Sequence, residues 1–144
     1  MYISKKKILV ILGVFILFAA LFVLWSDGEV EKGSFHDDPS VSVAPSEFVT
    51  YINSNIVVEN GQANVLIENN EKNHNICRVK IYESENDKLL YESDIIPTGY
   101  CIEKAQMLEQ LPRGEHDGYA VFVVLNDALE IKSTLTVDLK LTVI

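Results

Sequence analysis

The sequence predicts an all-β fold, a seven-stranded antiparallel sandwich preceded by one transmembrane helix. Three observations lead to this prediction: a long apolar run near the N-terminus, an acidic polar stretch after it, and a series of short alternating segments from residue 47 onward. A chain of 144 residues has room for one ordinary domain with an appendage. The net charge of -9 argues against nucleic acid as a partner, because phosphate binding needs a basic face.

The apolar run extends without interruption from Ile8 to Trp25. As a helix it would rise about 27 Å at ~1.5 Å per residue, close to the ~30 Å hydrocarbon core of a bilayer. Lysines at 5–7 precede it, so the positive-inside rule keeps residues 1–7 in the cytoplasm and places the rest of the chain outside. The run is longer than the apolar part of a secretory signal, and no A-x-A-like site follows it. We therefore expect an uncleaved single-pass signal anchor at 8–25, with a cleaved signal peptide and a buried core helix as alternatives.

Residues 26–46 are expected to form a flexible acidic linker. They contain two glycines, two prolines and several serines, with five acidic residues against one lysine. Such a stretch buries too little apolar surface to offset its ordering entropy. As a flexible chain it would reach about 25 Å on average, which lifts the following domain, residues 47–144, clear of the lipid headgroups.

The extracytoplasmic domain shows period-two alternation interrupted by turn residues. In its last segment Leu135, Val137 and Leu139 alternate with polar residues, which predicts one buried and one exposed face. Strands are expected at 56–58, 62–68, 76–84, 89–96, 101–107, 119–125 and 134–143. Asn60-Gly61 is a strong tight-turn signal, and a helical turn at 105–110 is an alternative for the end of the fifth segment. Seven strands at this spacing favour an antiparallel sandwich of immunoglobulin-like type, with a small barrel as the main competitor.

Three motifs carry a resemblance to a known group of proteins. They are Tyr91-Glu92-Ser93, Ile96-Pro97-Thr98-Gly99-Tyr100 and the corner Leu108-Glu109-Gln110-Leu111-Pro112-Arg113-Gly114. The chain resembles small membrane-anchored extracytoplasmic β-sandwich proteins of Gram-positive bacteria and, more distantly, the immunoglobulin-like fold of the BsuPI-type proteinase inhibitors. The resemblance implies a fold and an N-terminal anchor. It supplies no inhibitory residue, and the chain has His116 where the corner would usually carry an aromatic side chain.

Cys77 and Cys101 are the strongest candidates for a specific structural or chemical role. Both lie in the expected external domain, where an oxidising compartment permits a disulfide. Closing the loop between them would contribute ~3 kcal/mol in the loop-entropy model. The alternative is two separate thiols, with Cys77 a small core residue beside Val79 and Ile81. No C-x-x-C motif indicates redox catalysis.

The remaining candidate residues, the three histidines and the carboxylates, do not form a recognisable metal-binding or catalytic motif. His36 falls in the linker beside two aspartates, His74 in a polar loop and His116 at the corner, whereas a zinc site needs three or four converging ligands. His74 and Cys77 are three residues apart, and in a strand that spacing places side chains on opposite faces. No G-x-S-x-G motif or phosphate-binding loop is present. We expect no catalytic residue, no metal and no cofactor.

These observations favour a non-enzymatic module at the cell membrane. The expected function is protein interaction or envelope assembly outside the cytoplasm, with the bilayer as one partner through the N-terminal helix and an unidentified envelope protein as the other. Exposed sheet edges or loops would recruit that protein. A protease-inhibitor or small-ligand-binding domain is the alternative, and a thiol-dependent or hydrolytic enzyme is the third.

Overall fold

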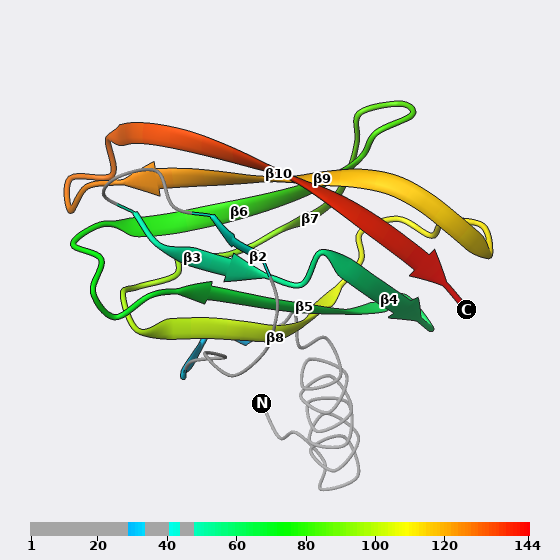
Figure 1. The fold of residues 1–144 in the computed structure, drawn as a ribbon, viewed down its shortest axis with the longest axis horizontal. Coiled ribbons are helices and arrows are strands. Elements are labelled where there is room, and N and C mark those ends of the chain that lie inside the picture. The colour runs from blue at the N-terminus through cyan, green and yellow to red at the C-terminus, as the bar shows by residue number, and fades with distance from the viewer. Residues whose placement is uncertain (1–28, 34–40, 44–47) are drawn as a thin grey trace, which may run out of the picture.

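The computed structural model describes residues 29–33, 41–43 and 48–144 (Figure 1). These residues form strands and loops, which confirms the all-β prediction. The expected membrane helix at 8–25 lies outside the described residues. Within them, no helix has the length and apolarity needed to cross a bilayer.

Ten strands follow one another along the described chain. They are β1 (Glu31–Lys32), β2 (Val41–Val43), β3 (Thr50–Ile52), β4 (Asn55–Glu59), β5 (Gln62–Asn69), β6 (Ile76–Glu83), β7 (Lys88–Glu92), β8 (Tyr100–Gln106), β9 (Gly114–Leu125) and β10 (Ile131–Val143). The seven segments expected from alternation correspond to β4 through β10. The helical turn considered at 105–110 does not form, because β8 continues to Gln106 and an irregular segment follows it.

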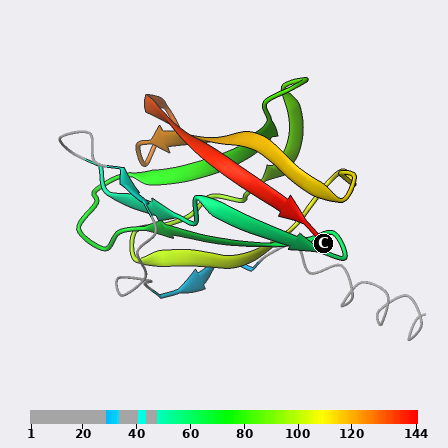
Figure 2. The ribbon, with the colours of Figure 1, turned by 45° about the vertical axis from the view of Figure 1, so that its right-hand side comes forward.

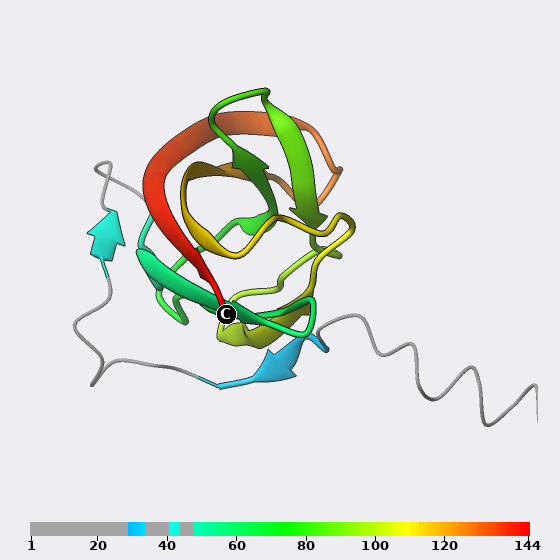
Figure 3. The same ribbon diagram turned by 90° about the vertical axis from the view of Figure 1, so that its right-hand side faces the viewer.

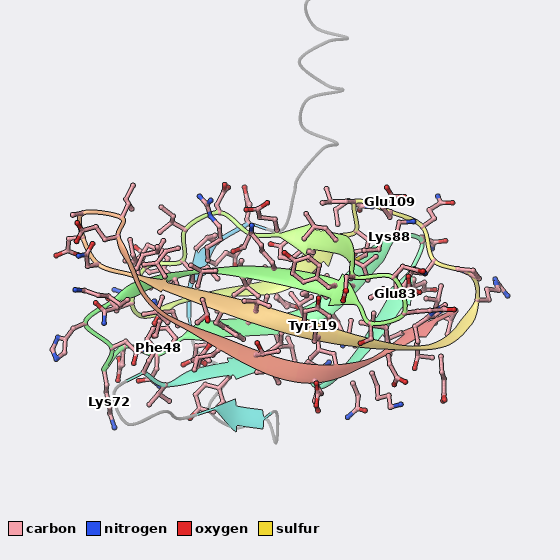
Figure 4. The ribbon with its side chains drawn as sticks, turned by 90° about the horizontal axis from the view of Figure 1, so that it is seen from above. Phe48, Lys72, Glu83, Lys88, Glu109 and Tyr119 are labelled. Carbon is pink, nitrogen blue, oxygen red and sulfur yellow. The ribbon has the colours of Figure 1, made fainter. Side chains whose placement is uncertain are left out.

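The strands belong to one sheet that curls around the core (Figure 3). Its order is β1-β8-β5-β4-β10-β9-β6-β7, with β3 also paired to β5 and β2 to β3. Neighbours are antiparallel except β4 and β10, which run parallel. The gap between β7 and the end of β8 is bridged where Leu108 N–H donates to Leu90 O at 2.8 Å. Lys88 and Glu109 form an ion pair at 3.2 Å beside it (Figure 4).

Ten strands are therefore present where seven were expected, and one pairing is parallel. The three additional strands, β1 to β3, have two or three residues each, which is too short for alternation to be recognised in the sequence. Two of them, β1 and β2, fall inside the stretch expected to be a linker. β1 pairs with β8, and β2 pairs with β3.

The core fills the inside of the curl with alternate side chains from both halves of the sheet. Val79 and Ile81 on β6 lie opposite Phe122 and Ala120 on β9, and all four are fully buried. Complete burial of a side chain such as Phe122 contributes about 1.5–3 kcal/mol. The other half of the sheet adds fully buried residues to the same cluster: Ile52, Ile56, Val65, Ile67 and Ile102.

Two local features of β4 and β5 shape this half of the sheet. Asn60 and Gly61 have φ of 52° and 79°, so the turn between β4 and β5 has the positive φ pair of a type I′ hairpin, as the Asn-Gly signal predicted. Further along β5, Leu66 has φ of 45° and the register with β8 shifts between Asn64 and Ile67. This β-bulge bends β5 and places its C-terminal half against β3.

Candidate functional site

The most distinctive surface of the molecule is one side of β10. β9 accompanies β10 along its whole length, from Ile131 to Val143. On the other side, β4 accompanies it only at 140–143. Figure 2 shows β10 meeting β4 only toward the C-terminus. In the described part of the chain, nothing pairs with this side of β10 at 131–139. We call these nine residues the open edge.

The open edge exists because the chain before β5 is divided between two partners. β3 pairs with β5, after which Asn53 N–H donates to Val65 O at 3.0 Å. The chain then crosses at Ser54, whose carbonyl accepts from Lys140 N–H at 2.8 Å, and continues as β4 beside β10. β4 therefore reaches β10 too late to cover the first nine residues of that strand.

The hydrogen bonds of the closed part identify which backbone groups face outward along the open part. Lys140 N–H donates to Ser54 O, and Ile144 N–H donates to Val58 O at 3.0 Å, so even-numbered residues point away from β9. Backbone direction alternates with period two in a strand. The N–H and C=O groups of Thr134, Thr136 and Asp138 therefore face the open edge. A bulge between Ile131 and Ser133 interrupts the register before them.

Side chains beside the open edge divide into two rows. Thr134, Thr136 and Asp138 are exposed on the outer face, whereas Val137 and Leu139 are buried and Leu135 is half-buried against the core. Proteins usually protect exposed edges with charges and bulges. Here Lys132 and the bulge protect only the beginning of the edge, and the threonine-rich stretch after them is regular. This stretch is suited to pairing with an added strand.

A groove of about 390 Å³ lies on the outer face where β4 joins β10. It is lined by Ser54, Asn55, Ser84, Asp117, Gly118, Asp138, Leu139 and Lys140. Lys140 Nζ is hydrogen-bonded to the Asp117 carboxylate, and this bond raises the pKa of Lys140, so the two charges compensate each other. Asp138 makes no hydrogen bond or ion pair with any other described residue. One carboxylate in the groove therefore remains uncompensated.

Two tyrosines lie next to the groove on the same outer face. Tyr119 on β9 is opposite Asp138 on one side and Tyr82 on the other (Tyr119 is labelled in Figure 4). The rings of Tyr82 and Tyr119 are stacked, with centroids 5.1 Å apart and planes inclined by 17°. Tyr119 Oη donates to Asp87 Oδ1 at 2.9 Å, which raises the pKa of Tyr119. Carboxylates beside aromatic rings favour the binding of a cation.

A second groove, of about 480 Å³, lies on the outer face of β4, β5 and β8. Four residues with side-chain amides line it: Asn60, Gln62, Asn64 and Gln106. Asn64 has a structural role, because its Oδ1 accepts from Val57 N–H at 3.0 Å where β4 and β5 separate. The remaining amides offer donors and acceptors to a small polar ligand, which is the kind of ligand the alternative function requires.

The two cysteines occupy different environments, and both are free thiols in the structure. Cys77 is fully buried within the core cluster, and burial raises its pKa to about 12. Cys101 lies outside that cluster, next to β1, and burial together with the nearby carboxylates of Glu68, Glu31 and Glu103 raises its pKa. Both thiols are therefore poor nucleophiles at neutral pH. This arrangement favours two separate thiols, and the disulfide stays a prediction.

The histidines do not come together at a metal site. His116 lies at the corner, where Nε2 donates to Pro112 O at 2.8 Å and Nδ1 is 3.2 Å from Glu83 Oε1. These contacts fasten the corner to the end of β6. His74 lies in the loop between β5 and β6, whereas His36 is outside the described residues. In the described ranges, no three side chains of histidine, cysteine, aspartate or glutamate gather closely enough to hold a metal ion.

A buried asparagine network lies at the end of β5 and in the loop around His74, which the sequence predicted only as a polar loop. Asn69 Nδ2 donates to Ile96 O at 2.9 Å and to Asn75 O at 3.1 Å. Asn73 Nδ2 donates to Asn69 Oδ1 at 2.7 Å and to Val49 O, and Asn73 Oδ1 accepts from Val49 N–H at 2.8 Å. The network joins this loop to the start of β3, and its role is structural.

Comparison with known proteins adds no identification: no family model and no curated protein matches this chain. The fold and the surface of the described residues define the class, an all-β module in which the open edge of β10 lies beside an acidic groove.

Proposed function

We propose that this chain is a non-enzymatic, membrane-tethered extracytoplasmic module that binds another protein by accepting a strand of that protein on the open edge of β10. The observation that carries the proposal is the regular open edge, where the backbone groups of Thr134, Thr136 and Asp138 face outward. An added strand would gain main-chain hydrogen bonds there, as in other cases of strand addition. Each such bond contributes about 0.5–1.5 kcal/mol net.

Apolar burial supports the same function. Leu135 is half-buried although it belongs to the inward row of β10, because β9 lies on one side of it and no described strand lies on the other. A partner strand with apolar residues on its inward row would cover this side chain. The apolar run at 8–25 supports the membrane tether, and the acidic charge of the following residues supports a domain that stands away from anionic headgroups.

The strand order also supports the finer architecture expected from the sequence. We propose that the curled sheet is an immunoglobulin-like sandwich whose two layers are β10-β9-β6-β7 and β3-β5-β8. An N-terminal stretch shared between the two layers, β3 on one and β4 on the other, fits this architecture. The protease-inhibitor alternative depends on fold resemblance alone, which is a weak guide to function.

Crosslinking from the open edge of the full chain in its native membrane tests the function. A photoreactive amino acid at Thr134 should give one adduct of defined size, and the same amino acid at Glu85, in the exposed turn after β6, should not. A second substitution, Thr136→Pro, removes an outward N–H and should abolish the adduct, whereas Thr136→Val retains the N–H and should preserve it. An adduct that persists in the proline variant, or no adduct from Thr134, would contradict strand addition.

A further inference from the structure

The open edge lies in an acidic environment, and this sets the charge of what it can bind. Residues 48–144 carry eight basic and fifteen acidic side chains. Among the charged groups close to the regular part of the edge, Lys140 is already paired with Asp117. Lys132 lies in the bulge between Ile131 and Ser133, at the far end of the edge. A positively charged partner therefore meets a favourable field along this part of the edge.

Asp138 is placed to select the partner at one position. Its backbone groups face the open edge, while its exposed side chain lines the groove and has no partner among the described residues. In a sheet, the side chain of a strand residue lies beside that of its direct neighbour on the adjacent strand. The residue of an added strand that lies beside Asp138 would thus share the outer face with this carboxylate.

The tyrosines extend the same preference beyond Asp138. Neighbouring strands are ~4.8 Å apart, so Tyr119 on β9 is about two such spacings from an added strand. A long side chain that extends from the added strand across Asp138 would approach the Tyr119 ring. Lysine and arginine have the necessary length, and both carry the charge that a carboxylate and an aromatic ring attract.

We propose that the segment bound at the open edge carries a lysine or arginine beside Asp138, and that this cation lies on the outer face against Asp138, at the side of the groove next to Tyr119. The partner is therefore an extended segment with apolar residues on its inward row and a basic residue on its outward row. This inference depends on the proposed strand addition, and it adds the residue that determines partner specificity.

The test uses the full chain, isotope-labelled in detergent micelles, and three nine-residue peptides that alternate threonine and valine. The peptides differ only at the central position, which is lysine, glutamate or methionine. We expect the lysine peptide to shift the amide signals of Thr134, Thr136 and Asp138 and to bind about tenfold more tightly than the glutamate peptide, because an attractive cross-strand pair replaces a repulsive one. Added salt should reduce this preference.

Substitutions distinguish a specific pair from general attraction to an acidic domain. Asp138→Asn should remove the preference for lysine and Asp138→Lys should reverse it, whereas Asp127→Lys, an equal charge change in the turn before β10, should leave it intact. If Asp127→Lys and Asp138→Lys have equal effects, the basic residue is not selected by Asp138 and the inference is wrong, even where Thr136→Pro still abolishes binding. If no peptide perturbs the edge amides and Thr136→Pro has no effect, strand addition itself is wrong.

Discussion

Two inner strands of this sheet, β8 and β10, each have one side that the described chain pairs only in part. On β8, β1 covers only the first two positions of that side, with Glu31 opposite Cys101 and Lys32 opposite Tyr100. On β10, the described chain pairs nothing with the outward side of residues 131–139. The comparison shows that the described N-terminal residues cover part of the side of β8, whereas they leave the whole stretch 131–139 of β10 without a partner strand. The proposed strand addition would fill this stretch.

The largest expected effect contrasts the two sides of β10 itself. By the alternation along the strand, Val137 N–H points toward β9 and Thr136 N–H points toward the open edge. Val137→Pro should therefore destabilise the domain by about 3 kcal/mol, because it leaves a buried carbonyl on β9 without its donor. Thr136→Pro should cost less than about 1 kcal/mol. Unfolding of the full chain in micelles, followed by circular dichroism, measures both values.

Equal destabilisation by the two proline substitutions would mean that Thr136 N–H has a partner in the folded chain. The edge would then be closed, and the comparison with β8 would fail. Thr136→Val serves as the control for loss of the hydroxyl group, and it should leave stability unchanged within about 0.5 kcal/mol.

The second effect compares the core, where Cys77 lies, with the part of β8 that β1 covers, where Cys101 lies. The pKa of Cys77 is about 12 in the folded chain, and an ordinary thiol ionises near 9.0. Between these values the unfolded chain has lost the proton and the folded chain retains it, so stability falls as pH rises through this window and is unaffected below it. The expected slope from Cys77 is about 1.4 kcal/mol per pH unit. Denaturation from pH 8 to 11 should show a smaller decline for Cys77→Ala than for the parent chain; parallel declines would contradict an enclosed thiol.

The smallest effect tests how firmly β1 covers β8. A Cβ atom added at Gly33 would lie 3.0 Å from Cys101 Sγ, so Gly33→Val should displace β1 from the edge. The substitution should raise the rate at which Cys101 reacts with a maleimide several-fold, since the thiolate becomes accessible, with little change in stability. Cys101→Ser, which retains only Cys77, identifies the reacting thiol. An unchanged rate would show that β1 does not protect Cys101.

Alternation predicted the position of most strands because it depends only on which face of a strand is buried. Val79, Val137 and Leu139 were placed correctly in this way. The beginning of β9 was missed: the strand starts at Gly114, whereas the apolar pattern begins at Tyr119. The intervening residues are polar or glycine, and they belong to a strand because β10 pairs with them.

The burial of polar residues could not be predicted from the alternation of apolar and polar residues, for a related reason. Glu68 and Asn69 are the last two residues of β5 and have the side chains of exposed polar residues, yet both are almost fully buried. Asn69 is accommodated because it donates two hydrogen bonds to backbone carbonyls, including Ile96 O, which is distant in sequence. The bulge at Leu66 changes the direction of the side chains before this point, and no residue in this segment is of a type that predicts a bulge.

The sequence by itself determined the all-β class, the seven principal strands and the turn at Asn60-Gly61, because these features depend on local alternation and on the backbone preferences of individual residues. The tertiary structure alone decided which strands become neighbours. The parallel pairing of Asn55 with Lys140 joins segments near opposite ends of the domain, and the transfer of the chain from β5 to β10 at Ser54 leaves the open edge. Pairing over such a distance depends on how the whole sheet curls around its core, which no local pattern encodes.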